Sequence, residues 1–120
     1  MIAIIPNFPD NVVAFTARGK VTSEDYESVL IPEVESKLEK HDKLRLLYHF
    51  DEDFSGFEAG AMWDDARVGL RHLNKWEKIA VVSDAKWLRR STKFFGFMMP
   101  GKVEVFKNYR FSEAKKWVVE

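Results

Sequence analysis

The segment from Lys86 to Met99, KWLRRSTKFFGFMM, interleaves basic and large apolar residues in a spacing that could bind an anionic amphiphile. On a helix with 100° per residue, the apolar residues on one arc are Trp87, Leu88, Phe94, Phe95 and Met98. The basic residues on the opposite arc are Lys86, Arg89, Arg90 and Lys93. Each basic side chain contributes about 1 kcal/mol of attraction near an anionic surface. The pattern predicts a helix that either packs on a sheet or lies on a membrane.

Two apolar residues of this segment do not fit a helix that only packs on a sheet. Phe97 falls on the basic arc, and Met99 lies outside the apolar one. Large apolar side chains in such places can enter the interfacial layer of a membrane. We therefore expect Phe97 and Met99 to face a membrane together with the basic arc. Pro100-Gly101 follows them directly, which indicates a hinged lid.

A second group of large side chains lies beside small residues. Phe54 and Phe57 bracket Ser55-Gly56, and the turn Ala59-Gly60-Ala61 leaves unfilled volume next to them. Such an arrangement can line a cavity that opens, and methionine is an adaptable filler for its walls. We expect an apolar pocket between the helix from Gly56 and the helix from Asp84. The predicted lining residues are Phe54, Phe57, Gly60, Met62, Trp87, Phe94, Phe95 and Met98.

Catalytic and metal-binding patterns are weak in this chain. There is no cysteine, which removes thiolate metal sites and cysteine nucleophiles. Glu58, Asp65 and His72 recur every seven residues along one helical flank, which could align an acid and a base, although a solvated border is the commoner meaning. The acids of 51–53 could hold Mg²⁺, but no second motif supplies phosphate contacts, so we expect an exposed acidic loop. We predict a non-enzyme with no metal and no cofactor.

The composition describes one folded domain. Its 120 residues, 46% of them hydrophobic and 32% charged, suit a single globular domain over residues 1–120. The net charge of zero is a cancellation, because residues 1–66 have 14 acidic and 6 basic side chains while residues 67–120 have 5 and 13. Either the two halves interleave and their charges disperse, or the basic side meets an anionic membrane or an acidic partner.

The order of apolar segments predicts an α/β fold. Ile2 to Ile5 and Val12 to Ala17 indicate an antiparallel hairpin, and Thr22 with Asp25 starts a helix that Pro32 should kink or split. Three strands separated by two long helices should be parallel. The predicted elements are strand Leu44–Phe50, helix Gly56–Leu73, strand Lys78–Ser83, helix 84–98, strand Val103–Phe106 and a helix from Ser112.

These elements, in the order ββαβαβαβα, resemble the SpoIIAA-like proteins of the STAS superfamily. The resemblance rests on SEDYESVLIPEVESKL, LRLLYHF, FSGFEAGAMWDDAR, KIAVVSDAKW and VEVFKNYRFSEAKKWV. It implies a small bacterial domain with a mixed, mostly parallel sheet. Relatives of this fold include anti-sigma-factor antagonists and, by fold similarity, the lipid-carrying SEC14 type of domain.

The resemblance also implies a candidate phosphorylation site. STAS antagonists have a phosphorylatable serine in an Asp-Ser-Ser-Gly motif, and this chain has Asp53-Phe54-Ser55-Gly56 at the matching place. Ser55 thus keeps the position, while the first serine of the motif is replaced. A phosphate is favourable at a helix N-terminus, but the acids of 51–53 would repel it. A plain helix cap is the alternative role for Ser55.

Two functions follow from the sequence. The first is a non-catalytic binding domain for a small hydrophobic or lipid-like molecule, with peripheral association to an anionic membrane. The alternative is a signalling switch that binds a protein partner through the loop at Ser55. We expect no nucleic-acid partner, and a homodimer stays open. Because MIAIIPNFPD lacks the pattern of a signal peptide, we expect a cytoplasmic protein, peripheral at the inner membrane surface.

Overall fold

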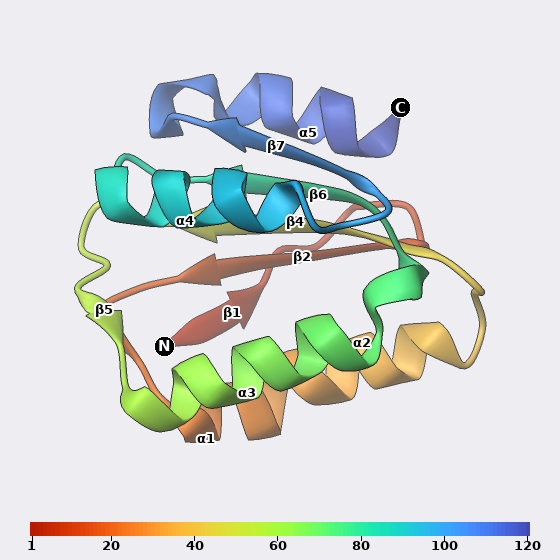
Figure 1. The fold of residues 1–120 in the computed structure, drawn as a ribbon, viewed down its shortest axis with the longest axis horizontal. Coiled ribbons are helices and arrows are strands. Elements are labelled where there is room, and N and C mark those ends of the chain that lie inside the picture. The colour runs from red at the N-terminus through yellow and green to blue at the C-terminus, as the bar shows by residue number, and fades with distance from the viewer.

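A five-stranded sheet in the order β1-β2-β4-β6-β7 forms the centre of the computed structural model (Figure 1). The structure describes the backbone of residues 1–120 and every side chain except those of residues 66 and 68–70. The strands are β1 (Ile2–Ile4), β2 (Val12–Ala17), β4 (Leu44–Phe50), β6 (Trp76–Val82) and β7 (Lys102–Phe106). The helices are α1 (Ser23–Asp25), α2 (Ile31–Leu38), α3 (Ala59–Arg71), α4 (Lys86–Gly96) and α5 (Phe111–Val119).

The strand directions confirm the predicted mixed sheet. β1 pairs with β2 antiparallel, with Ile2 opposite Ala17. The pairs β2 with β4, β4 with β6, and β6 with β7 are all parallel. A parallel neighbour requires a crossover connection, and α3 and α4 supply the crossovers from β4 to β6 and from β6 to β7.

The first helical segment is divided, as its proline predicts. Thr22 caps it, because the Thr22 hydroxyl accepts a hydrogen bond from the Asp25 amide (3.2 Å) and the Asp25 carboxylate accepts one from the Thr22 amide (2.8 Å). A π-helical turn, Tyr26–Leu30, follows α1. Pro32 lies in the first turn of α2, where its missing N–H does least harm.

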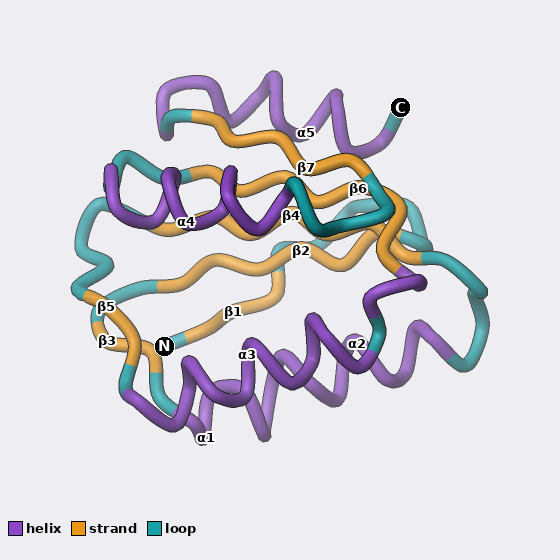
Figure 2. Tube along the Cα trace, in the orientation of Figure 1, coloured by secondary structure: helices purple, strands orange, loops and turns teal.

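The expected helix from Gly56 begins three residues later than predicted. Gly56–Phe57 forms a short strand, β5, which pairs in parallel with β3 (Lys20–Val21) in a separate two-stranded sheet (Figure 2). Gly56 has a φ of 129°, which is incompatible with a helix and is favourable only for glycine. α3 therefore starts at Ala59.

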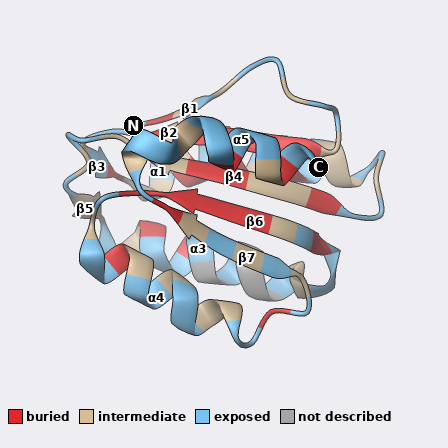
Figure 3. Ribbon diagram, turned by 90° about the horizontal axis from the view of Figure 1, so that it is seen from above, coloured by how far each residue is buried: buried red, intermediate tan, exposed pale blue. Residues whose placement is uncertain are grey.

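Helices cover both faces of the central sheet (Figure 3). α1 to α4 lie on one face, over a core that includes Phe15, Tyr48 and Leu88. α5 covers the other face, where Ala114 and Val118 pack on Leu47 and other buried residues. Successive strand residues point to opposite faces, so the continuous apolar run of β4 contributes to both cores.

Candidate functional site

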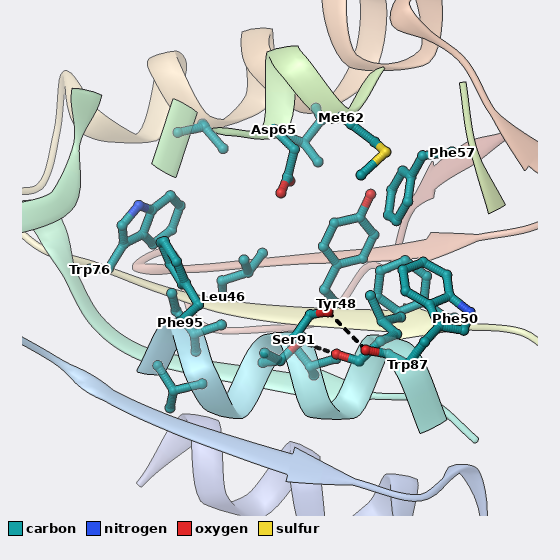
Figure 4. A pocket seen from close by; sticks show the side chains of 17 residues that line it. Leu46, Tyr48, Phe50, Phe57, Met62, Asp65, Trp76, Trp87, Ser91 and Phe95 are labelled. Carbon is teal, nitrogen blue, oxygen red and sulfur yellow. Dashed lines mark hydrogen bonds between the residues drawn. The ribbon is translucent and has the colours of Figure 1, made fainter. Parts of the chain in front are cut away.

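A pocket of about 360 Å³ lies between the sheet and the helices α2, α3 and α4 (Figure 4). Its size falls in the range of small-molecule sites. Most of the lining side chains are aliphatic or aromatic. They are Leu30, Val34, Leu46, Tyr48, Phe50, Phe57, Met62, Asp65, Trp76, Ile79, Val81, Trp87, Leu88, Ser91, Thr92, Phe95 and Val103.

The strand and helix periodicities explain how these residues meet. Leu46, Tyr48 and Phe50 alternate along β4, so all three point to the face covered by α1 to α4. Leu88 and Phe95 lie seven residues apart on α4, and seven residues is close to two helical turns. The pocket therefore has a sheet floor and helical walls.

The structure places half of the predicted lining residues in the pocket. Phe57, Met62, Trp87 and Phe95 line it. Gly60 instead faces α1, since a Cβ on Gly60 would lie 2.1 Å from the Ser23 hydroxyl. It therefore makes room for the neighbouring helix rather than for a ligand.

Phe54 belongs to an aromatic cluster beside the pocket and does not line it. Its ring centroid lies 4.8 Å from that of Phe50, 5.2 Å from that of Phe57 and 6.3 Å from that of Trp87. These separations are typical of packed aromatic pairs. The cluster connects the end of β4 and β5 to the first turn of α4. Phe54 thus supports the wall that Phe50, Phe57 and Trp87 form.

Phe94 and Met98 point away from the pocket, contrary to the prediction. Their exposed fractions are 70% and 60%, and that of Phe97 is 91%. The inward face of α4 includes Gly96, where a Cβ would lie 3.2 Å from Cβ of Val103. Gly96 thus approaches β7 closely, while three large apolar side chains lie in solvent at the C-terminal end of the helix.

Met99 is buried, so the expectation that it faces a membrane is wrong. Its exposed fraction is 8%, and it belongs to the core on the side of α1 to α4. Gly101 packs against β6, where a Cβ would lie 2.2 Å from the Trp76 carbonyl oxygen. The turn after α4 is therefore anchored to the sheet at Met99 and Gly101, and this contact contradicts an open hinge at Pro100-Gly101.

The basic residues of α4 are available for an anionic surface. Lys86, Arg90 and Lys93 are exposed, and Arg89 is partly buried. Among the residues that the structure describes, none of these four forms an ion pair. Their charges are therefore not neutralised locally, unlike that of Arg45, which pairs with Glu77 at 2.6 Å.

A polar network lies at the α3 side of the pocket. The Tyr26 hydroxyl donates a hydrogen bond to Oδ1 of Asp65 (2.7 Å), and it lies 2.9 Å from the Tyr48 hydroxyl. Burial raises the pKa of both tyrosines, and the nearby Asp65 charge adds to this effect. Both phenols therefore remain protonated.

Asp65 is exposed to solvent, although the protein around it partly desolvates its carboxylate. Burial raises the pKa of Asp65, and the hydrogen bond from Tyr26 lowers it to a smaller extent. Asp65 lines the pocket, and its carboxylate points into it (Figure 4). The predicted line of Glu58, Asp65 and His72 does not form a joint site, since His72 Nε2 lies 3.1 Å from Glu35 and Glu58 accepts a hydrogen bond from the Ser23 amide (3.4 Å).

Ser55 is exposed and precedes β5 rather than a helix. Its amide donates a hydrogen bond to the Gly19 carbonyl (2.9 Å). Ser55 is therefore not the cap of α3, and a phosphate on it would gain nothing from an adjacent helix N-terminus. Asp51 of the same acidic loop pairs with Arg18 at 3.4 Å. Within the described part of the chain, no group of three or more His, Asp or Glu residues is arranged for a metal ion.

Comparisons with known proteins support the fold. A family model described as SpoIIAA-like matches residues 12–119. A crystal structure from Shewanella loihica PV-4, of an uncharacterised protein from the DUF3478 family with a SpoIIAA-like fold, is similar with a TM-score of 0.76 and 28% sequence identity. The match covers 98% of this chain and 93% of that one. The comparison with curated proteins found no match.

Proposed function

Since this chain belongs to the SpoIIAA-like family, and its helices enclose an apolar pocket on the sheet, we propose that it is a non-catalytic domain that binds a small hydrophobic or lipid-like molecule. The pocket is the observation that supports this proposal. Its lining, as far as the structure describes it, is mostly aliphatic and aromatic and includes one carboxylate, that of Asp65, and the pocket is open to solvent. Burying an apolar ligand there would contribute about 25 cal/mol per Å² of surface removed from water.

Peripheral association with an anionic membrane is the second part of the proposal. Phe94, Phe97 and Met98 form an exposed apolar group next to the basic residues of α4. Apolar side chains that enter the interfacial layer, flanked by basic side chains, are typical of membrane-surface helices. In the described part of the chain, no helix is both long and apolar enough to span a bilayer. A ligand taken from the membrane would then enter beside α4.

The pocket is tested with a neutral hydrophobic fluorophore, N-phenyl-1-naphthylamine. Ser91 lines the pocket from an exposed position of α4, so Ser91→Trp should fill the space without disturbing the core. Lys93→Trp is the matched control, because Lys93 is exposed on the same helix and does not line the pocket.

We expect saturable fluorescence enhancement with the unmodified protein and with Lys93→Trp, and at least about tenfold weaker binding with Ser91→Trp, a loss of about 1.4 kcal/mol. Circular dichroism of each variant checks that it is folded, and Ser91→Phe replaces Ser91→Trp if the latter is not. No saturable enhancement with the unmodified protein, or equal affinity in a folded pocket-filling variant, would contradict the proposal.

The alternative function is a STAS-type signalling switch. The observation in its favour is that Ser55 is exposed in a loop, where a kinase could reach it. Asp53 and its acidic neighbours disfavour it, because they would repel a phosphate. If Ser55→Asp changes binding to a co-purifying protein and the unmodified protein does not bind the fluorophore, the signalling function is better supported than the ligand-binding function.

A further inference from the structure

We infer that Asp65 selects the polar group of the ligand, so that the pocket favours an amphiphile with a protonated amine over one with a hydroxyl or a carboxylate. This inference rests on the proposed function, because it assigns a chemistry to the same pocket. It depends on the position of Asp65 in an otherwise apolar wall and on the directions of the hydrogen bonds around it.

The two hydrogen bonds at the α3 side of the pocket run in one direction, from Tyr48 to Tyr26 and from Tyr26 to Asp65. Tyr26 has one hydroxyl proton, which it donates to Oδ1 of Asp65. The contact between the two phenols, at 2.9 Å, must therefore use the proton of Tyr48. Neither phenol keeps a proton for a ligand. This end of the pocket offers hydrogen-bond acceptors, and a ligand must bring the donor.

The two other hydroxyl groups in the pocket lining also have no free proton for a ligand. Ser91 Oγ donates to the Trp87 carbonyl at 2.9 Å, and Thr92 Oγ1 donates to the Leu88 carbonyl at 2.8 Å (Figure 4). These protons are used within α4, as they commonly are for Ser and Thr inside helices. Among the lining side chains described, every hydroxyl proton is thus directed away from the ligand.

The charge of the pocket favours a cation over a neutral donor. No Lys, Arg or His is present among the residues found to line the pocket, so the Asp65 carboxylate has no cationic partner there. Burial makes its ionised form unfavourable, and an ammonium group in contact with it would reverse that penalty. A carboxylate ligand would instead place a second negative charge beside that of Asp65, which is unfavourable.

The test compares octylamine, 1-octanol and octanoate, which share one chain and differ in the polar group. Trp76 and Trp87 line the pocket, so intrinsic tryptophan fluorescence can report binding. We expect octylamine to bind at least about tenfold tighter than 1-octanol at neutral pH, the ratio that a charge-assisted hydrogen bond produces, and octanoate to bind most weakly.

Asp65→Asn keeps the shape of the side chain and removes its charge, so it should reduce the preference for octylamine over 1-octanol to less than about threefold. Asp65→Ser is used if Asp65→Asn does not fold. Glu52→Gln is the matched control, since it removes an exposed acidic charge outside the pocket and should leave the preference unchanged.

The outcomes distinguish a failure of the proposed binding function from a failure of the role assigned to Asp65. If none of the three compounds binds the unmodified protein, the proposed function itself fails. If 1-octanol binds but octylamine binds no tighter, or octanoate binds tightest, the pocket stands and the role of Asp65 is wrong. A preference for the amine that persists in Asp65→Asn and Asp65→Ser also overturns the role of Asp65.

Discussion

The Tyr26 hydroxyl lies 2.7 Å from Oδ1 of Asp65, so a hydrogen bond joins the π-helical turn before α2 to the middle of α3. Tyr26 is fully buried, and its hydroxyl also contacts Tyr48 on β4. One phenol thus connects two helices and the sheet at the polar end of the pocket. The same hydrogen bond orients the carboxylate that we assign to ligand selection.

Replacing Tyr26 by Phe should destabilise the protein. Tyr26→Phe removes the donor to Asp65 and leaves the buried hydroxyl of Tyr48 without its partner. Such a loss reduces the free energy of unfolding by roughly 1–3 kcal/mol. Urea unfolding measures it, with Tyr109→Phe as the control, since Tyr109 is 83% exposed and should change the value by less than about 0.5 kcal/mol. Equal effects of the two substitutions would mean that the network contributes nothing to stability.

Replacing Asp65 by Asn should stabilise the ligand-free protein at neutral pH. The pKa of Asp65 is raised in the folded state, so the folded protein binds this proton more tightly than the unfolded chain does. The stability associated with Asp65 is therefore present at low pH and is lost as the pH rises above the unfolded value of 3.8 and through the raised pKa.

Asp65→Asn does not titrate, so its advantage should grow from pH 4 to pH 7. We expect a gain of up to about 1 kcal/mol at pH 7, because water in the pocket screens part of the burial penalty. Thermal unfolding across this pH range measures the difference. A variant that is less stable than the unmodified protein at pH 7 would contradict the expected penalty. A gain, together with weaker binding of the amine, would identify Asp65 as a residue kept for function at the expense of stability.

The sheet could be predicted from the sequence because its signals are local. The apolar run of β4 and the two long helices that separate the parallel strands are visible in the residue pattern alone. The region of the pocket followed from the same order of elements. Phe57, Met62, Trp87 and Phe95 could be named because large apolar residues on the two enclosing helices and β5 have few other places to pack.

The remaining features depend on tertiary contacts that have no sequence period. Gly96 lies close to Val103 on the inward side of α4, and Phe94 on the same helix is exposed. Met99 is buried in the core, and Gly101, two residues later, packs on the Trp76 carbonyl. In the sequence, Asp65 is one acid on a helical flank. Its hydrogen bond to Tyr26, 39 residues away, and its place in the pocket lining emerge only from the tertiary structure. The acidic spacing was a visible signal, but not a specific one.

Gly101 should tolerate no side chain. A Cβ there would lie 2.2 Å from the Trp76 carbonyl oxygen and 2.9 Å from that of Glu77, and both are backbone atoms of β6. Gly101→Ala should reduce the free energy of unfolding by about 2 kcal/mol or more. Gly96→Ala is the control, because its contact with Val103 involves a side chain and alanine favours a helix by about 1 kcal/mol over glycine, so the net change should be small. If both substitutions are equally tolerated in urea unfolding, the turn after α4 is not anchored at Gly101.

Phe97 should govern association with anionic membranes. It is 91% exposed next to the basic residues of α4, so burial of its ring in the interfacial layer would add to their attraction. In co-sedimentation with phosphatidylglycerol vesicles at low salt, Phe97→Glu should weaken binding by about tenfold or more, since it exchanges roughly 1.5–3 kcal/mol of apolar burial for a repelled charge. Tyr109→Glu is the control, because Tyr109 is similarly exposed but lies outside α4, and it should weaken binding less.

Binding that weakens with added salt would agree with the role of the basic residues. No binding by the unmodified protein at low salt would refute the membrane proposal and leave the pocket proposal intact, because the pocket faces the sheet and Phe97 does not line it.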